Sequence, residues 1–170
     1  MVVHSQFVRQ DQLDAYVKLG LMPSFFTNHT FYWGDDYPAL LGEERGQAIS
    51  PAASAAARGI RFTNHTDFVV TPVDSIFTVW SAVNRISKTG KVIGASERIP
   101  VGRALQALTA DAAFQYRLEK DRGTLEAGKV ADLVLLSRNP LTTDPGKLRD
   151  VVVLETVKDG KTVYRRPAPK

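Results

Sequence analysis

Hydrophobic and polar positions along the first 70 residues alternate between strand-like runs and helical spacing. The strand-like runs are apolar and rich in β-branched or aromatic residues, and they span residues 1–8, 21–26 and 60–70. Residues 9–20 place apolar side chains at helical spacing, and residues 50–59 form an alanine-rich segment with Ser50 as the expected N-cap. This order, with short connections, predicts parallel strands wrapped by helices, and residues 27–42 are expected to form a loop.

The pattern changes character in the second half of the chain. Residues 73–86 are strongly periodic, and residues 100–118 predict one or two further helices, the second capped by Asp111. Beyond about residue 123 the apolar runs are strand-like and lie at 132–136, 151–157 and 162–164. Asp159 and Gly160 between the last two runs suit a tight hairpin turn. The tail therefore predicts an antiparallel sheet appended to a parallel α/β body.

Composition narrows the class of protein. The 170 residues are 44% hydrophobic and 24% charged, which is typical of a globular chain. The net charge of +4 is small and its lysines and arginines are scattered among acids, so we expect no nucleic-acid partner. No apolar run approaches the roughly 18 residues of a membrane span, and the first residues lack a secretion signal. With no cysteine, the sequence favours a cytoplasmic protein without a membrane partner.

The candidate chemistry lies in three histidines and one aspartate. His4, His29 and His65 each lie at or just beyond the end of a predicted strand, and Asp67 is expected on the same strand face as His65. The carboxyl ends of parallel strands form the functional rim of α/β folds. Imidazole and carboxylate ligands together suit zinc, iron or manganese, and a carboxylate beside such a metal can accept a proton from water.

Simpler interpretations stay open for the same residues. A histidine at a strand end is commonly an ordinary hydrogen-bonded loop residue. His65 and Asp67 could pair with a buried arginine such as Arg61, and Asp67 could cap the loop before the next helix. The aromatic residues around His29 are expected mostly to pack that segment, with Trp33 kept as a candidate pocket residue.

Several segments resemble one enzyme family. The tail segments "GTLEAGKVADLVLLSRNPL" and "VVVLETVKDGKTVY" resemble the C-terminal signature of metal-dependent amidohydrolases. The similarity is closest to amidohydrolase family 3, which includes YtcJ-like proteins and N-substituted formamide deformylases. It extends back through "DFVVTPVDSIFTVWSAVNR" and "LGLMPSFFTNHTFYWGDDY" to "VVHSQFV", and so it covers essentially the whole chain.

The resemblance implies a role for each candidate residue. By this resemblance we expect a barrel that carries one or two divalent metals, here zinc, at its rim. His4 matches the histidine of the fifth strand and His29 that of the sixth, both metal ligands. Asp67 matches the aspartate of the eighth strand, which contacts metal and acts as general base on the attacking water. His65 is not a usual ligand and, with Trp33, is assigned to substrate binding.

The resemblance also covers only part of a family member. No His-x-His pair occurs and no lysine precedes His4, so the chain resembles the C-terminal half of such an enzyme. The expected fold is α/β: a partial (β/α)8 TIM-type barrel, roughly strands 5–8 with their helices, in residues 1–122. Residues 123–170 are expected to form a C-terminal piece of a small β-sandwich.

The implied activity is metal-dependent hydrolysis of a non-peptide carbon–nitrogen bond in a small-molecule amide, cyclic amide or N-formyl substrate. The alternatives are a non-catalytic half-barrel that pairs with a separate N-terminal half or with itself as a homo-oligomer, and an inactive truncated product.

Overall fold

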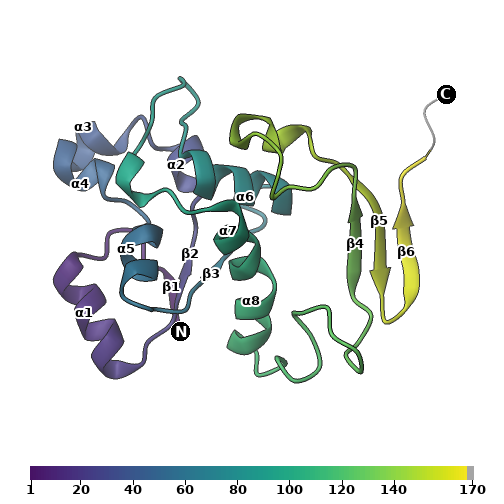
Figure 1. Cartoon of the computed structure of the whole chain (residues 1–170). Coiled ribbons are helices and arrows are strands. Elements are labelled where there is room, and N and C mark those ends of the chain that lie inside the picture. The colour runs from purple at the N-terminus through teal and green to yellow at the C-terminus, as the bar shows by residue number, and fades with distance from the viewer. Residues whose placement is uncertain (168–170) are drawn as a thin grey trace.

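Two three-stranded sheets organise the protein in a computed structural model, which describes residues 1–167 (Figure 1). The first sheet is wholly parallel in the order β1-β2-β3, with strands β1 (Val2–His4), β2 (Pro23–Phe25) and β3 (Thr63–Asn64). The second is antiparallel in the order β4-β5-β6, with strands β4 (Leu133–Leu136), β5 (Val153–Lys158) and β6 (Lys161–Arg165). Helices α6, α7 and α8 lie between the two sheets. The expected α/β class and the antiparallel tail are confirmed.

The helices connect and cover the parallel strands. They are α1 (Gln10–Leu19), α2 (His29–Tyr32), α3 (Tyr37–Leu41), α4 (Glu43–Gln47), α5 (Ala52–Ala57), α6 (Ser75–Asn84), α7 (Val101–Leu108) and α8 (Ala110–Gln115), with 3-10 turns η1 (Ala95–Glu97) and η2 (Pro145–Asp150). Gly20 ends α1 in the left-handed conformation, as its position predicts. Asp74 begins α6 by accepting a 2.8 Å hydrogen bond from the amide of Phe77. None of these helices is both long and apolar enough to cross a membrane.

Three local predictions were wrong. The expected loop at 27–42 contains α2 and α3, and residues 26–62 contain no strand, so the body has three parallel strands where the resemblance implied about four. The third strand is only two residues long, although the amide of His65 still bonds to the neighbouring strand β2. Consequently His65 and Asp67 lie beyond the strand and not on one strand face.

Two expected helix caps were also wrong. Ser50 lies outside α5 with a φ of 45°, and Pro51 holds the N-cap position. Asp111 lies inside the first turn of α8, where its buried carboxylate pairs with Arg103 at 2.7 Å and with Arg61 at 3.4 Å. Both side chains make tertiary contacts that outweigh the local capping preference.

One hydrophobic core joins the parallel sheet to the helices. Phe25 and Phe62 are fully or almost fully buried and meet edge to face, with ring centres 5.2 Å apart. Trp80 of α6 faces the same core, and Leu148 of η2 packs into it from the C-terminal region. The segment that leads into the second sheet is therefore anchored in the core of the first.

Arg85 is the largest fully buried side chain. It ends α6 in the left-handed conformation. Its guanidinium donates three hydrogen bonds to backbone carbonyls, at 2.7 Å to Ile93, 3.1 Å to Ser50 and 2.6 Å to Ile49. Burial lowers the pKa of Arg85 to about 10, against an opposing effect of Glu97. The arginine thus remains charged near neutral pH and joins three segments.

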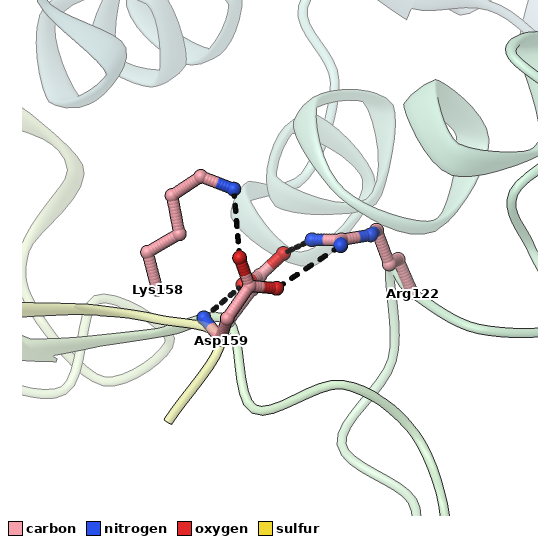
Figure 2. Close-up of polar contacts among 4 residues, drawn as sticks. Arg122, Lys158 and Asp159 are labelled. Carbon is pink, nitrogen blue, oxygen red and sulfur yellow. Dashed lines mark hydrogen bonds and ion pairs between the residues drawn. The ribbon is translucent and has the colours of Figure 1, made fainter. Parts of the chain in front are cut away.

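The hairpin of the tail forms where Asp159 and Gly160 predict it, and both residues have positive φ. Figure 2 shows how this turn is tied to the chain after α8. Arg122 pairs with Asp159 at 3.1 Å and also with Asp132, while Lys158 lies 3.2 Å from Asp159. The amide of Asp159 donates to the Asp132 carboxylate at 2.9 Å. These exposed charges set the turn's position and contribute little to the overall stability.

Replacing Arg85 tests the buried cross-link. Arg85→Met should lower the free energy of unfolding by about 3 kcal/mol or more, because a buried acceptor left unpaired costs about 1–3 kcal/mol and three lose their donor. Denaturant unfolding measures the loss. Arg138→Met, at an exposed position, is the matched control and should leave the unfolding midpoint nearly unchanged. A loss below about 1 kcal/mol would contradict the assigned role.

Candidate metal and catalytic site

The register of the parallel sheet brings the first and third strands to one level. His4 at the end of β1 pairs with Phe25 of β2, and Phe25 pairs with Asn64 of β3. The amide of His65 then donates a 2.9 Å hydrogen bond to the carbonyl of Phe25. Both imidazoles therefore leave the sheet at its carboxyl edge, which is where α/β folds place their sites.

His4, His65 and Asp67 form a compact group of metal-type ligands. One ligand atom from each lies within 4.8 Å of the others. Nδ1 of His4 is 2.9 Å from Nε2 of His65, and Nε2 of His4 is 3.7 Å from Oδ2 of Asp67. The side chains of His4 and Asp67 are each 38% exposed, so the group is open to small molecules.

The backbone around this group is unusual. His4, Ser5 and Asp67 have φ values of 64°, 44° and 51°, all in the left-handed region. Such conformations cost non-glycine residues of order 1–3 kcal/mol each and cluster at functional sites. Here they turn the chain sharply after β1 and after β3, which directs the side chains of His4 and Asp67 toward one another.

His29, the first residue of α2, lies beside this group without being one of its three members. Its ring centre lies 5.9 Å from that of His4, and its Nδ1 contacts Oε1 of Gln6. Two imidazoles on one zinc ion have ring centres roughly 5–6 Å apart, given Zn–N bonds of about 2.0–2.1 Å. The His4 and His29 rings are spaced in that range, but the 4.8 Å group of ligand atoms contains His65 and not His29. Trp33 stands edge to face against His29, with ring centres 5.0 Å apart.

The surroundings lower the pKa values of His29 and His65 and so favour the neutral form of these two imidazoles. Burial lowers the pKa of His29 from 6.5 to about 4, with a further lowering by the nearby charge of His4. Burial and His4 also lower the pKa of His65. Neutral imidazole is the form that binds metal, so the surroundings favour the coordinating state.

The structure brings His4, His65 and Asp67 together, and it places His29 beside them with Trp33 against its ring. Their assignment as ligands, base and substrate contacts stays a prediction. Of the simpler interpretations, pairing with Arg61 is not observed, because Arg61 pairs with Asp111. In the loop before α6, the backbone carbonyl of Asp67 accepts a 2.6 Å hydrogen bond from the amide of Val70, and the helix itself is capped by Asp74.

Two buried polar residues of the site were not recognised in the sequence. Ser24 of β2 places its hydroxyl 2.8 Å from Nδ1 of His65. Gln6 contacts His29 and is 8% exposed. Ser24 could have been recognised as a site residue because it is polar within an otherwise apolar strand run. Nothing in the local sequence marks Gln6 in this way.

Comparisons with known proteins found relatives of this chain. A family model described as "Amidohydrolase family" matches residues 1–164. "Putative amidohydrolase YtcJ" of Bacillus subtilis (strain 168) is 28% identical over an alignment of length 172, which covers 97% of this chain and 32% of the relative. "N-substituted formamide deformylase" of Arthrobacter pascens is 29% identical over 137 residues, which cover 80% of this chain and 25% of the relative.

A solved structure shares the fold. The crystal structure of an uncharacterized metal-dependent hydrolase from Pyrococcus horikoshii OT3 superposes with a TM-score of 0.71 at 28% identity. The match covers 85% of this chain and 30% of that one. The chain thus spans about a third or less of the length of the relatives it matches.

The lowered pKa of His29 is measurable by NMR titration in the presence of a chelator. We expect its imidazole to stay neutral down to about pH 4. Because its unfolded-state pKa is near 6.5, the unfolded chain binds more protons between these values, so this residue's contribution to stability is lost as pH falls from 6.5 to 4. His29→Asn should remove that part of the pH dependence. A midpoint near 6.5 for His29 in the folded chain would contradict the assignment.

Proposed function

This chain belongs to the amidohydrolase family, and from that premise we propose that it carries the metal-binding and proton-transfer residues of a hydrolase acting on non-peptide carbon–nitrogen bonds. The single observation that carries the proposal is the convergence of His4, His65 and Asp67 within 4.8 Å at the carboxyl edge of a parallel sheet. Separate strands and loops supply these three groups, which is the usual construction of a site at a strand rim.

The donor set fits a divalent cation, for which we propose zinc. Neutral imidazoles with a carboxylate are ligands that zinc commonly takes, and the observed spacing leaves room for one ion among them. We assign His4, His29 and Asp67 as the ligands. The 4.8 Å group contains His65 in place of His29, so His65 is a further candidate ligand besides its predicted contact with substrate. A bound cation would polarise the scissile carbonyl and make water acidic near neutral pH.

Asp67 is proposed as the catalytic base. Its carboxylate would accept a proton from the attacking water and later deliver it to the leaving nitrogen, so it ends the cycle as it began. His65 and Trp33 would contact the substrate, since His65 lies against His4 and Trp33 lies against His29. The proposed substrates are small amides, cyclic amides or N-formyl compounds, a class that includes the bond named in the formamide deformylase relative.

The extent of the fold bears on activity. We propose that the three parallel strands are part of a (β/α)8-type barrel in residues 1–122, and that residues 123–167 contribute to a small β-sandwich. β1 and β3 each have one unpaired edge in the three-stranded sheet, and strands with open edges accept further strands. A cytoplasmic location also remains a prediction.

Those open edges favour a second candidate function, a half-barrel that is active only with additional strands from another chain or a second copy. Light scattering separates the two. A monomer that binds metal and hydrolyses substrate would exclude this second candidate. A dimer, or a gain of hydrolysis only when an N-terminal half of a family member is added, would support it.

Metal binding is the first test. The purified chain, stripped with a chelator and titrated with Zn²⁺ by calorimetry, should bind zinc. His4→Ala should weaken that binding at least about tenfold, because one of few ligands is lost. Asp150→Asn, at an exposed position outside the site, is the control and should bind like the unchanged chain. Equal affinity of His4→Ala and the unchanged chain would remove His4 from the ligand set.

Asp67→Asn tests the base. In a preparation that hydrolyses an N-formyl or cyclic amide substrate, this change should lower kcat by about 10²–10⁴-fold, the usual contribution of general acid–base catalysis. The unfolding midpoint should change little, because the Asp67 side chain is partly exposed. Turnover within a few-fold of the unchanged protein would exclude Asp67 as the base.

A further inference from the structure

Gln6 is a buried polar side chain at the edge of the site, without a task in the proposed hydrolysis. It lies in the turn after β1, and only 8% of its surface is exposed. Its Oε1 accepts a 3.0 Å hydrogen bond from the hydroxyl of Ser50 and lies within hydrogen-bond distance of Nδ1 of His29. Its Nε2 is buried without a partner among residues 1–167.

The contact between Gln6 and His29 determines where the imidazole carries its proton. An amide oxygen can only accept hydrogen bonds, so the ring nitrogen facing it must carry the hydrogen. Neutral His29 is therefore protonated on Nδ1, which leaves the lone pair on Nε2. A metal can bind only the nitrogen with the lone pair.

We propose that Gln6 is a positioning residue that fixes His29 in the Nδ1-protonated tautomer and so presents its Nε2 to the metal. The inference rests on the proposed function in one respect, the use of His29 as a ligand. Metal-binding histidines generally donate their second ring nitrogen to a neighbouring acceptor, and loss of that acceptor typically costs 10–100-fold in metal affinity.

Ser50 holds Gln6 in place through two hydrogen bonds. The amide of Ser50 donates to the carbonyl of Gln6 at 2.8 Å, in addition to the bond from its hydroxyl. Ser50 itself is fully buried, and its carbonyl accepts from the guanidinium of Arg85. A chain of hydrogen bonds thus runs from the end of α6 through Ser50 and Gln6 to His29.

Two competing explanations make different predictions. If the amide of Gln6 were turned over, its nitrogen would face His29, and the proton would lie on Nε2, which could not then bind metal. If Gln6 only fills space, an isosteric apolar side chain would replace it without effect on the tautomer. The imidazole tautomer therefore discriminates among all three arrangements.

The first measurement is ¹⁵N NMR of the histidine side chains in the chelated protein at one fixed pH above neutrality. We expect the Nδ1-protonated form of His29 in the unchanged chain. Gln6→Met should produce a mixture of tautomers, and Gln6→Glu should restore the Nδ1-protonated form, because a carboxylate is also an acceptor. A proton on Nε2 in the unchanged chain, or an unchanged tautomer in Gln6→Met, would overturn the proposal.

The second measurement is zinc affinity by competition with a chromophoric chelator. Gln6→Met should bind zinc 10–100-fold more weakly, and Gln6→Glu should recover most of that loss. Gln10→Met is the matched control, since Gln10 lies exposed on α1 and outside the site. Equal zinc affinity in the unchanged chain and Gln6→Met would overturn the positioning role. Absence of zinc binding in every variant would instead refute the proposed function, while the tautomers would still decide the role of Gln6.

Discussion

Parallel pairing of three short strands is the constraint on which the site depends. β2 lies in the middle, and its residue Phe25 is paired with His4 on one side and with Asn64 on the other. Because side chains alternate along a strand, a slip of one residue would send His4 to the opposite face. The strands have only two or three residues each, so their register is maintained by the core around Phe25 and Phe62 more than by the hydrogen bonds of the sheet itself.

Buried polar groups form a second level of organisation. The segment between α4 and α5 has no regular structure, and Arg85 fixes it by donating to the carbonyls of Ile49 and Ser50. Ser50 in turn donates a hydrogen bond to Gln6. Burying a guanidinium is unfavourable unless its donors are satisfied. Three backbone carbonyls accept hydrogen bonds from it here. One of them belongs to Ser50, so Ser50 is fixed in position although it lies in a loop. The candidate ligand His29 is thereby linked to the end of α6 through Ser50 and Gln6.

The second sheet has a different relation to the site. Its strands are largely exposed, and exposed ion pairs such as Arg122–Asp159 tie its turn to the preceding chain. Its connection to the body runs through η2, where Leu148 packs into the core and the carbonyl of Pro145 accepts a 2.9 Å hydrogen bond from Asn84 of α6. The sheet can therefore support the helices behind the parallel strands without contributing a residue to the group around His4.

The order of residues was enough to predict the α/β class, helices α1 and α6, the hairpin at Asp159 and Gly160, and the rim position of all three histidines, because each depends on local periodicity or turn chemistry. Tertiary structure alone decided which imidazoles meet. His65 lies nearer to His4 than its separation of 61 residues suggests, while His29 is oriented by Gln6. Tertiary structure also decided that Ser50 and Asp111 make buried contacts and do not cap helices. The cost of burying a polar group depends on neighbours that are distant in the chain.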